Sequence, residues 1–112
     1  MVERFYSGTT DGDVTAREGG TSYRLPARLD LRKHSPAAFA WGCGSAPAQQ
    51  LALALLADAL GDDRRAIALY QDFKFRCIAQ LPSCWIMSRS RIMAYVDELE
   101  AAALARPLLA QR

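Results

Sequence analysis

Cys43 and His34 are the residue types in this chain best suited to covalent chemistry. Cys43 stands between Gly42 and Gly44, directly before a predicted helix. A thiol near a helix N-terminus can have a lowered pKa and act as a nucleophile. His34, the only histidine, precedes it by nine residues and is the one imidazole that could serve as its base. The alternative is a glycine-flanked turn whose thiol packs under Trp41. Because the local signature of papain-like enzymes, with its downstream histidine, is missing, we favour the turn and assign no catalytic residue.

The spacing of glycines and cysteines also bears on ligand sites. The segment Gly42-Cys43-Gly44-Ser45 could offer backbone N–H groups to an anion, but neither GxxxxGK[ST] nor GxGxxG occurs, so a turn is favoured. Cys43, Cys77, Cys84 and His34 lack CxxC and HxxxH spacing, and we expect no metal and no cofactor. An odd number of cysteines in a chain of this size favours reduced thiols and a cytoplasmic location.

Arginines and a tryptophan are the candidate binding residues. Arg24, Arg28 and Arg32 recur at intervals of four residues, a basic cluster that suits nucleic acid when aromatic rings accompany it. Interleaved acids such as Asp30 favour a solvated strand face instead. Since arginine and tryptophan dominate binding hot spots, Arg24, Arg28, Arg32 and Trp41 are our candidate partner contacts.

Composition limits the class of protein. The chain has 112 residues, 51% apolar and 23% charged, with a formal net charge of +2. These values exclude a disordered chain and a polybasic tail protein, and they predict one domain over residues 1–112. The longest apolar run, Leu51–Ala57, is much shorter than the roughly 18–20 residues of a membrane span. The first residues show no apolar signal-peptide core, so we expect a soluble cytoplasmic protein with no membrane partner.

Residues 1–33 predict a β-meander. Glu3–Ser7, Asp13–Arg17 and Tyr23–Leu31 alternate apolar and polar side chains, and the last segment is one strand or two strands joined through Pro26. Glycine-rich turns separate these segments, which predicts three antiparallel strands. Such a small sheet needs a cover on its apolar face.

The sequence of residues 45–106 predicts helices that cover the apolar face of this sheet. Ser45 or Gly44 can cap a helix over Ala48–Leu60, which has Pro47 in its first turn. Asp58 is the only charge in this helix, and a helix that is apolar on every side is a buried one.

Two further helices follow. The second begins after Asp62 or Asp63 and runs to about Leu81. Ser83–Met87 is a short apolar link that could be extended. Ser88 caps a third helix, which we expect to run to about residue 105 and to stop before residue 107, a proline. The predicted fold class is therefore α+β, a three-stranded antiparallel sheet packed against about three helices.

Three segments carry a resemblance to a known family. They are Leu29-Asp30-Leu31-Arg32-Lys33-His34-Ser35-Pro36, Phe39-Ala40-Trp41-Gly42, and Pro47-Ala48-Gln49-Gln50 with the apolar run that follows. With these segments the chain resembles a small uncharacterised domain of bacteria and their phages, a domain of unknown function. The resemblance covers most of the chain beyond the first strands. It implies no known activity and no cofactor, and it implies no requirement for a thiol at position 43.

The phage association shapes the expected function. Small single-domain proteins of mobile elements often bind and block a host complex, an analogy from size and context. We expect a non-enzymatic interaction protein that binds a host protein or ribonucleoprotein stoichiometrically, for example to inhibit a CRISPR effector complex. A small nucleic-acid-binding module is the first alternative, with affinity that falls steeply with salt. A cysteine enzyme that uses Cys43 with His34 is the second.

Overall fold

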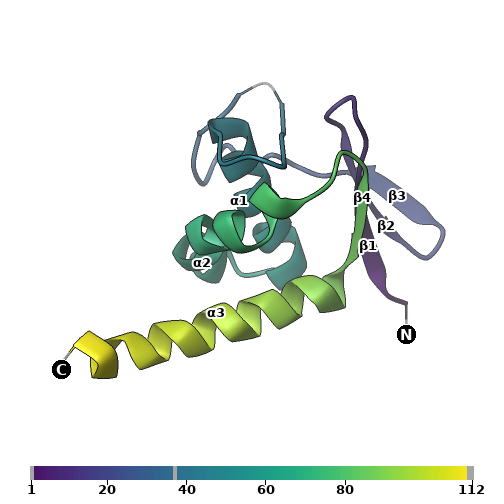
Figure 1. The fold of residues 1–112 in the computed structure, drawn as a ribbon. Coiled ribbons are helices and arrows are strands. Elements are labelled where there is room, and N and C mark those ends of the chain that lie inside the picture. Colours follow the sequence, from purple (N-terminus) through teal and green to yellow (C-terminus); the bar gives the residue numbers. More distant parts are fainter. Residues whose placement is uncertain (1, 37, 111–112) are drawn as a thin grey trace.

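The computed structural model describes residues 2–36 and 38–110, with side chains described up to residue 105. Figure 1 shows a sheet on one side, a group of helices beside it and a long C-terminal helix below. The elements in chain order are β1 (Arg4–Gly8), β2 (Val14–Glu18), β3 (Thr21–Arg24), α1 (Ala46–Leu60), α2 (Asp63–Arg76), the 3₁₀ turn η1 (Ile78–Gln80), β4 (Trp85–Ser88) and α3 (Arg89–Ala110).

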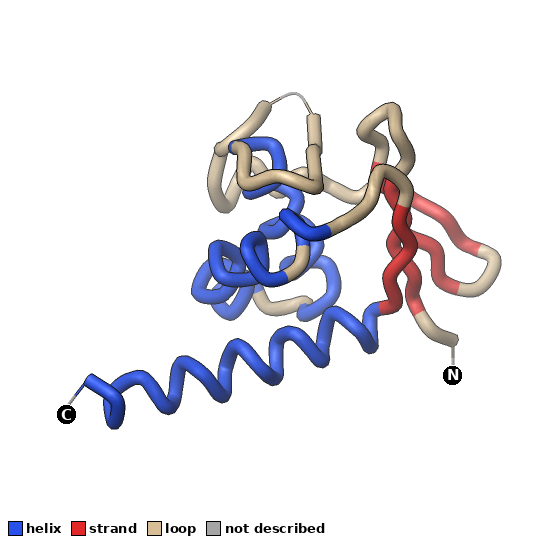
Figure 2. Tube along the Cα trace, viewed as in Figure 1, coloured by secondary structure: helices blue, strands red, loops and turns tan. Residues whose placement is uncertain are grey.

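The strands form one antiparallel sheet in the order β3-β2-β1-β4. The helices lie on one face of this sheet, and in Figure 2 no element of the described residues covers the other face. Successive side chains of a strand point to opposite faces. Tyr6, Ala16 and Met87, which stand opposite one another, are buried toward the helices. Phe5 and Ile86 are 42% and 72% exposed on the outer face. The α+β class is thus confirmed.

The predicted number of strands was wrong, because the short link before α3 adds a fourth. β4 pairs with β1, so that Ser7 stands opposite Ile86 and Gly8 opposite Trp85. This pairing joins residues about eighty positions apart in the chain. Local periodicity cannot reveal such a partner, and four residues are too few to show a strand by alternation alone.

The third predicted strand, Tyr23–Leu31, was too long, and with it the predicted extent of the β-meander. The strand ends at Arg24. Pro26 has no N–H to donate to a neighbouring strand, and Arg28 has φ +56°, in the left-handed region that extended strands do not use. The alternation after Arg24 therefore belongs to a folded loop.

A buried glutamine of α1 holds that loop. Gln50 is fully buried, and its Nε2 donates to the carbonyl oxygens of Ala27 at 2.6 Å and Arg32 at 3.0 Å. Its Oε1 accepts from the backbone N–H groups of His34 at 2.7 Å and Ser35 at 3.2 Å. A primary amide has two N–H donors and an oxygen with two lone pairs, so every hydrogen-bonding position of Gln50 is used.

Helix α1 matches its prediction closely. Ser45 is its N-cap residue, a proline stands in the first turn, and the chain turns left-handed at Gly61 with φ +63°. Nearly every side chain between Leu51 and Ala59 is buried, and this helix forms the centre of the core. The prediction of a helix buried on all sides is confirmed.

The second helix ends earlier than predicted and the third ends later. α2 stops at Arg76 and a 3₁₀ turn follows. A continuous helix would direct the Ile78 carbonyl at Pro82, which has no N–H, whereas here that carbonyl accepts from Gly42 at 2.9 Å. α3 is capped by Ser88, as predicted, but it continues through Pro107 to its end. The prediction that the helix would stop at this proline was therefore wrong: a proline removes one backbone donor, and a helix can continue past it with a kink.

Candidate functional site

Two adjoining hollows form a groove on the described surface. The first, about 350 Å³, lies among Asp13, Arg24 and Phe39. The second, about 660 Å³, is lined by Phe39, Trp41 and the segment 81–83. Gly12 and Phe39 line both, so the two hollows adjoin, and we call them together the Trp41 groove. It is built by the β1–β2 turn, the loop before α1 and the segment that leads into β4.

Trp41 is held rigidly at this groove. Its Nε1 donates to the Ser83 carbonyl oxygen at 3.0 Å, and its ring meets Trp85 edge-to-face at a centroid distance of 5.7 Å. Trp85 in turn packs on Gly8, where a Cβ would come within 2.4 Å of the Trp85 Nε1. That glycine leaves room for the buried Trp85 indole, against which the Trp41 ring packs. A partly exposed ring of fixed orientation loses little conformational entropy on binding.

Polar groups surround the first hollow. Arg24, whose side chain is 80% exposed, pairs with Asp13 at 2.7 Å. Asp11 accepts from the Thr9 hydroxyl and from the backbone N–H of Asp13, and these hydrogen bonds lower the pKa of its carboxyl group. The groove therefore combines aromatic rings at one end with charged side chains at the other.

The structure separates the remaining candidate arginines from this groove. Arg28 binds Asp30 and Asp63 through paired hydrogen bonds of 2.8–3.1 Å, which raise the pKa of its guanidinium. It ties the loop to the start of α2 and lines another hollow. Arg32 is exposed and donates to the carbonyl of Leu31 at 2.7 Å. Of the four sequence candidates, only Arg24 and Trp41 line the same groove.

The proposed nucleophile and base have other partners. The Nε2 of His34 lies 2.8 Å from the Tyr70 hydroxyl, and the two rings pack against each other. The exposed Cys43 thiol lies 3.2 Å from the Ser45 hydroxyl, and hydrogen bonds with Ser45 lower its pKa. The contact between Cys43 and His34 that the cysteine-enzyme alternative requires is not among the hydrogen bonds of the described residues.

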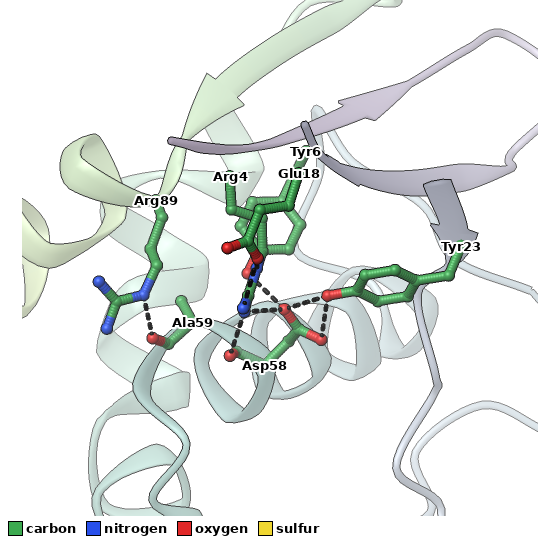
Figure 3. A network of polar contacts seen from close by, with 7 residues as sticks. All are labelled: Arg4, Tyr6, Glu18, Tyr23, Asp58, Ala59 and Arg89. Atoms are coloured by element: carbon green, nitrogen blue, oxygen red, sulfur yellow. Dashed lines mark hydrogen bonds and ion pairs between the residues drawn. The ribbon is translucent and has the colours of Figure 1, made fainter. Parts of the chain in front are cut away.

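Sequence reasoning missed the network around Asp58, shown in Figure 3. This carboxylate of α1 accepts from Arg4 at 2.9 Å, from Tyr23 at 2.9 Å and from Tyr6. Burial and the bond to Asp58 raise the pKa of Tyr23 to about 12, and burial raises that of Tyr6 further. The Arg4 guanidinium also pairs with Glu18 at 2.9 Å. The network fastens three strands to α1. The sequence did contain a signal for this network, because Asp58 is the single charge in an otherwise apolar helix.

The described residues have neither a metal-binding cluster nor a membrane-spanning helix. Within residues 2–36 and 38–110, no group of three or more histidine, cysteine or acidic side chains is arranged to hold a metal ion. Over the same residues, no helix has both the length and the apolar character needed to cross a membrane.

The fold and the groove define a class of protein, a small α+β domain in which helices cover one face of a four-stranded antiparallel sheet. The chain belongs to a family of unknown function, DUF6166, whose profile matches residues 6–98. This agrees with the resemblance to an uncharacterised domain. No curated protein and no solved structure shows significant similarity to the chain. The match begins in β1 and ends within α3, so it contains the whole Trp41 groove.

Proposed function

We propose that this chain is a non-enzymatic binding protein of a phage or other mobile element, which acts by stoichiometric binding to a host protein or ribonucleoprotein such as a CRISPR effector complex. The partly exposed Trp41 ring, held at this groove by a hydrogen bond to Ser83 and a contact with Trp85, is the observation that supports it best. Tryptophans and arginines carry much of the binding energy of protein interfaces, and here Trp41 and Arg24 line two adjoining hollows.

The pairing of Arg24 and Arg28, two of the three arginines in the candidate cluster, favours a protein surface over bare nucleic acid as the primary contact. Arg24 and Arg28 are engaged with carboxylates, and so are Arg65 and Arg76. Nucleic-acid affinity comes largely from cations that are free to replace counterions along the phosphate backbone. Arginines already paired with acids contribute less to that exchange.

The engagement of Cys43 with Ser45 and of His34 with Tyr70 also supports binding over covalent catalysis. A nucleophile is activated by a base within hydrogen-bonding reach. Here the nearest polar partner of the thiol is a hydroxyl group.

The test is affinity capture from bacterial lysate with the full chain as bait, with and without nuclease treatment, followed by mass spectrometry. We expect one protein complex in stoichiometric yield that survives nuclease. Trp41→Ala should weaken its capture about 30-fold, the effect of losing a hot spot of about 2 kcal/mol. Phe75→Ala is the matched control, since Phe75 is a 61% exposed aromatic residue outside the groove.

A second variant separates binding from folding. Arg24→Glu alters a side chain that is 80% exposed, so it should leave the circular dichroism spectrum unchanged while it weakens capture. Recovery that vanishes with nuclease and falls steeply with salt would replace the proposal with the nucleic-acid module. Equal capture by wild type, Trp41→Ala and Arg24→Glu would refute the groove as the contact surface.

A further inference from the structure

The free edge of β4 differs from the other edge of the sheet. In the order β3-β2-β1-β4, each outer strand has one neighbour among the described residues. The N–H and C=O groups on the outer side of such a strand have no strand partner. β3 carries Thr21, Ser22 and Arg24 and leads into Pro26, features that discourage a further strand from pairing. β4 carries Trp85-Ile86-Met87 and has neither a charged residue nor a proline.

A hollow lies along this unprotected edge. It measures about 310 Å³ and is lined by β4, by the segment that precedes it and by the first turns of α3. Leu81 and Tyr95 form apolar parts of its wall. The Tyr95 ring is fixed by an edge-to-face contact with the buried Phe73 at 5.7 Å. The edge thus borders a preformed depression between a strand and a helix.

One charged side chain lines this hollow. Arg91, in the first turn of α3, is exposed, and no carboxylate in the described part of the chain lies within ion-pair distance of it. The other residues around the hollow are uncharged. A ligand that fills it would therefore meet one unpaired guanidinium, which prefers a carboxylate.

We propose that the β4 edge and this hollow bind an extended acidic segment of a partner protein by strand addition. Backbone hydrogen bonds to β4 would supply affinity, and alternate side chains would supply specificity. One set of side chains would lie over Ile86, which is 72% exposed, and the other set would enter the hollow. An aspartate or glutamate in the second set would pair with Arg91.

Charge favours a partner segment over a second copy of this chain. A symmetric pairing of two β4 edges would bring two copies of the same hollow together. Each copy would contribute an Arg91 and no carboxylate from the hollow, so like charges would meet. An acidic segment removes that repulsion. This surface does not include Arg24 or Trp41, although Leu81 and Pro82 also line their groove, and it does not depend on the function proposed for that groove.

The test uses a displayed library of random peptides of about twelve residues, selected on the full chain. We expect the selected pool to be enriched in aspartate and glutamate. Arg91→Glu should weaken binding of the selected peptides about tenfold or more, which corresponds to about 1.4 kcal/mol. Arg64→Glu is the control, because Arg64 is an exposed arginine of α2 outside the hollow. A glutamate in the first turn of α3 suits the helix dipole, so Arg91→Glu should fold.

Two readouts distinguish strand addition from other contacts. Methylation of alternate peptide nitrogens should abolish binding, whereas methylation of the intervening ones should not, because only every second N–H of an added strand faces β4. The amide resonances of residues 85–88 should shift, and their hydrogen exchange should slow. A library that yields no binder, a pool without acidic enrichment, or shifts centred on Trp41 would overturn the proposal. Concentration-dependent dimerisation through β4 would assign the edge to a second copy.

Discussion

Replacing Gln50 with leucine tests how the candidate groove is supported. The change keeps the volume of the side chain but removes four hydrogen bonds to the loop over residues 27–35. At about 1 kcal/mol for each bond, the loss is about 4 kcal/mol, and burial of the leucine returns a part of it. We therefore expect the free energy of unfolding to fall by about 3–4 kcal/mol. In a domain of this size the melting temperature should drop by about 15 °C.

The assay is urea unfolding followed by circular dichroism, with the slope against urea checked for constancy. Gln71→Leu is the matched control: Gln71 is an exposed glutamine of α2, and its replacement should change stability by less than about 0.5 kcal/mol. Gln50→Leu should also weaken capture through the Trp41 groove, since the loop leads directly into it. A loss below about 1 kcal/mol would refute the view that this amide holds the loop.

Three further predictions follow from packing and ionisation. Gly8→Ala should cost about 1–3 kcal/mol in urea unfolding, because its Cβ would fall 2.4 Å from a buried indole nitrogen, whereas Gly20→Ala, with open space around it, should cost much less. The pKa of Tyr23 is raised to about 12. The stability that its neutral hydroxyl contributes is therefore complete below about pH 10 and is lost as pH rises toward 12. Tyr23→Phe should flatten this alkaline decline in melting temperature. Burial raises the pKa of Cys77 to about 11, so a disulfide reagent should label Cys43 in the native protein and Cys77 only after unfolding, and native labelling of Cys77 would contradict the core packing.

Features with a local cause could be predicted from the sequence. The helix Ala46–Leu60 follows from a proline in its first turn, an unbroken apolar run and a glycine stop, all within one segment. Ser88 was recognised as a cap for the same reason. The first two strands followed from their alternation and the turn residues between them.

Features that depend on distant partners could not be predicted. β4 is a strand because β1 lies beside it, and the alternation after Arg24 is a loop because Gln50 satisfies its backbone groups from another element. The same distinction applies to the residues of the candidate site. Trp41 was chosen for its residue type and does line a groove, whereas Arg28 was chosen for its charge and is paired with Asp30 and Asp63. Residue type indicates what a side chain can do, and only the fold shows whether a neighbouring side chain already pairs with it.

The two proposed surfaces share a boundary, and this makes their relation testable. Leu81 and Pro82 line both the Trp41 groove and the hollow beside β4. One partner could therefore contact both surfaces. If it does, Trp41→Ala and Arg91→Glu should each weaken capture of the same protein. Their effects should add in the double variant, because the two side chains line different hollows. If each variant removes a different protein from the captured set, the surfaces serve two partners and the idea of a single spanning partner is refuted.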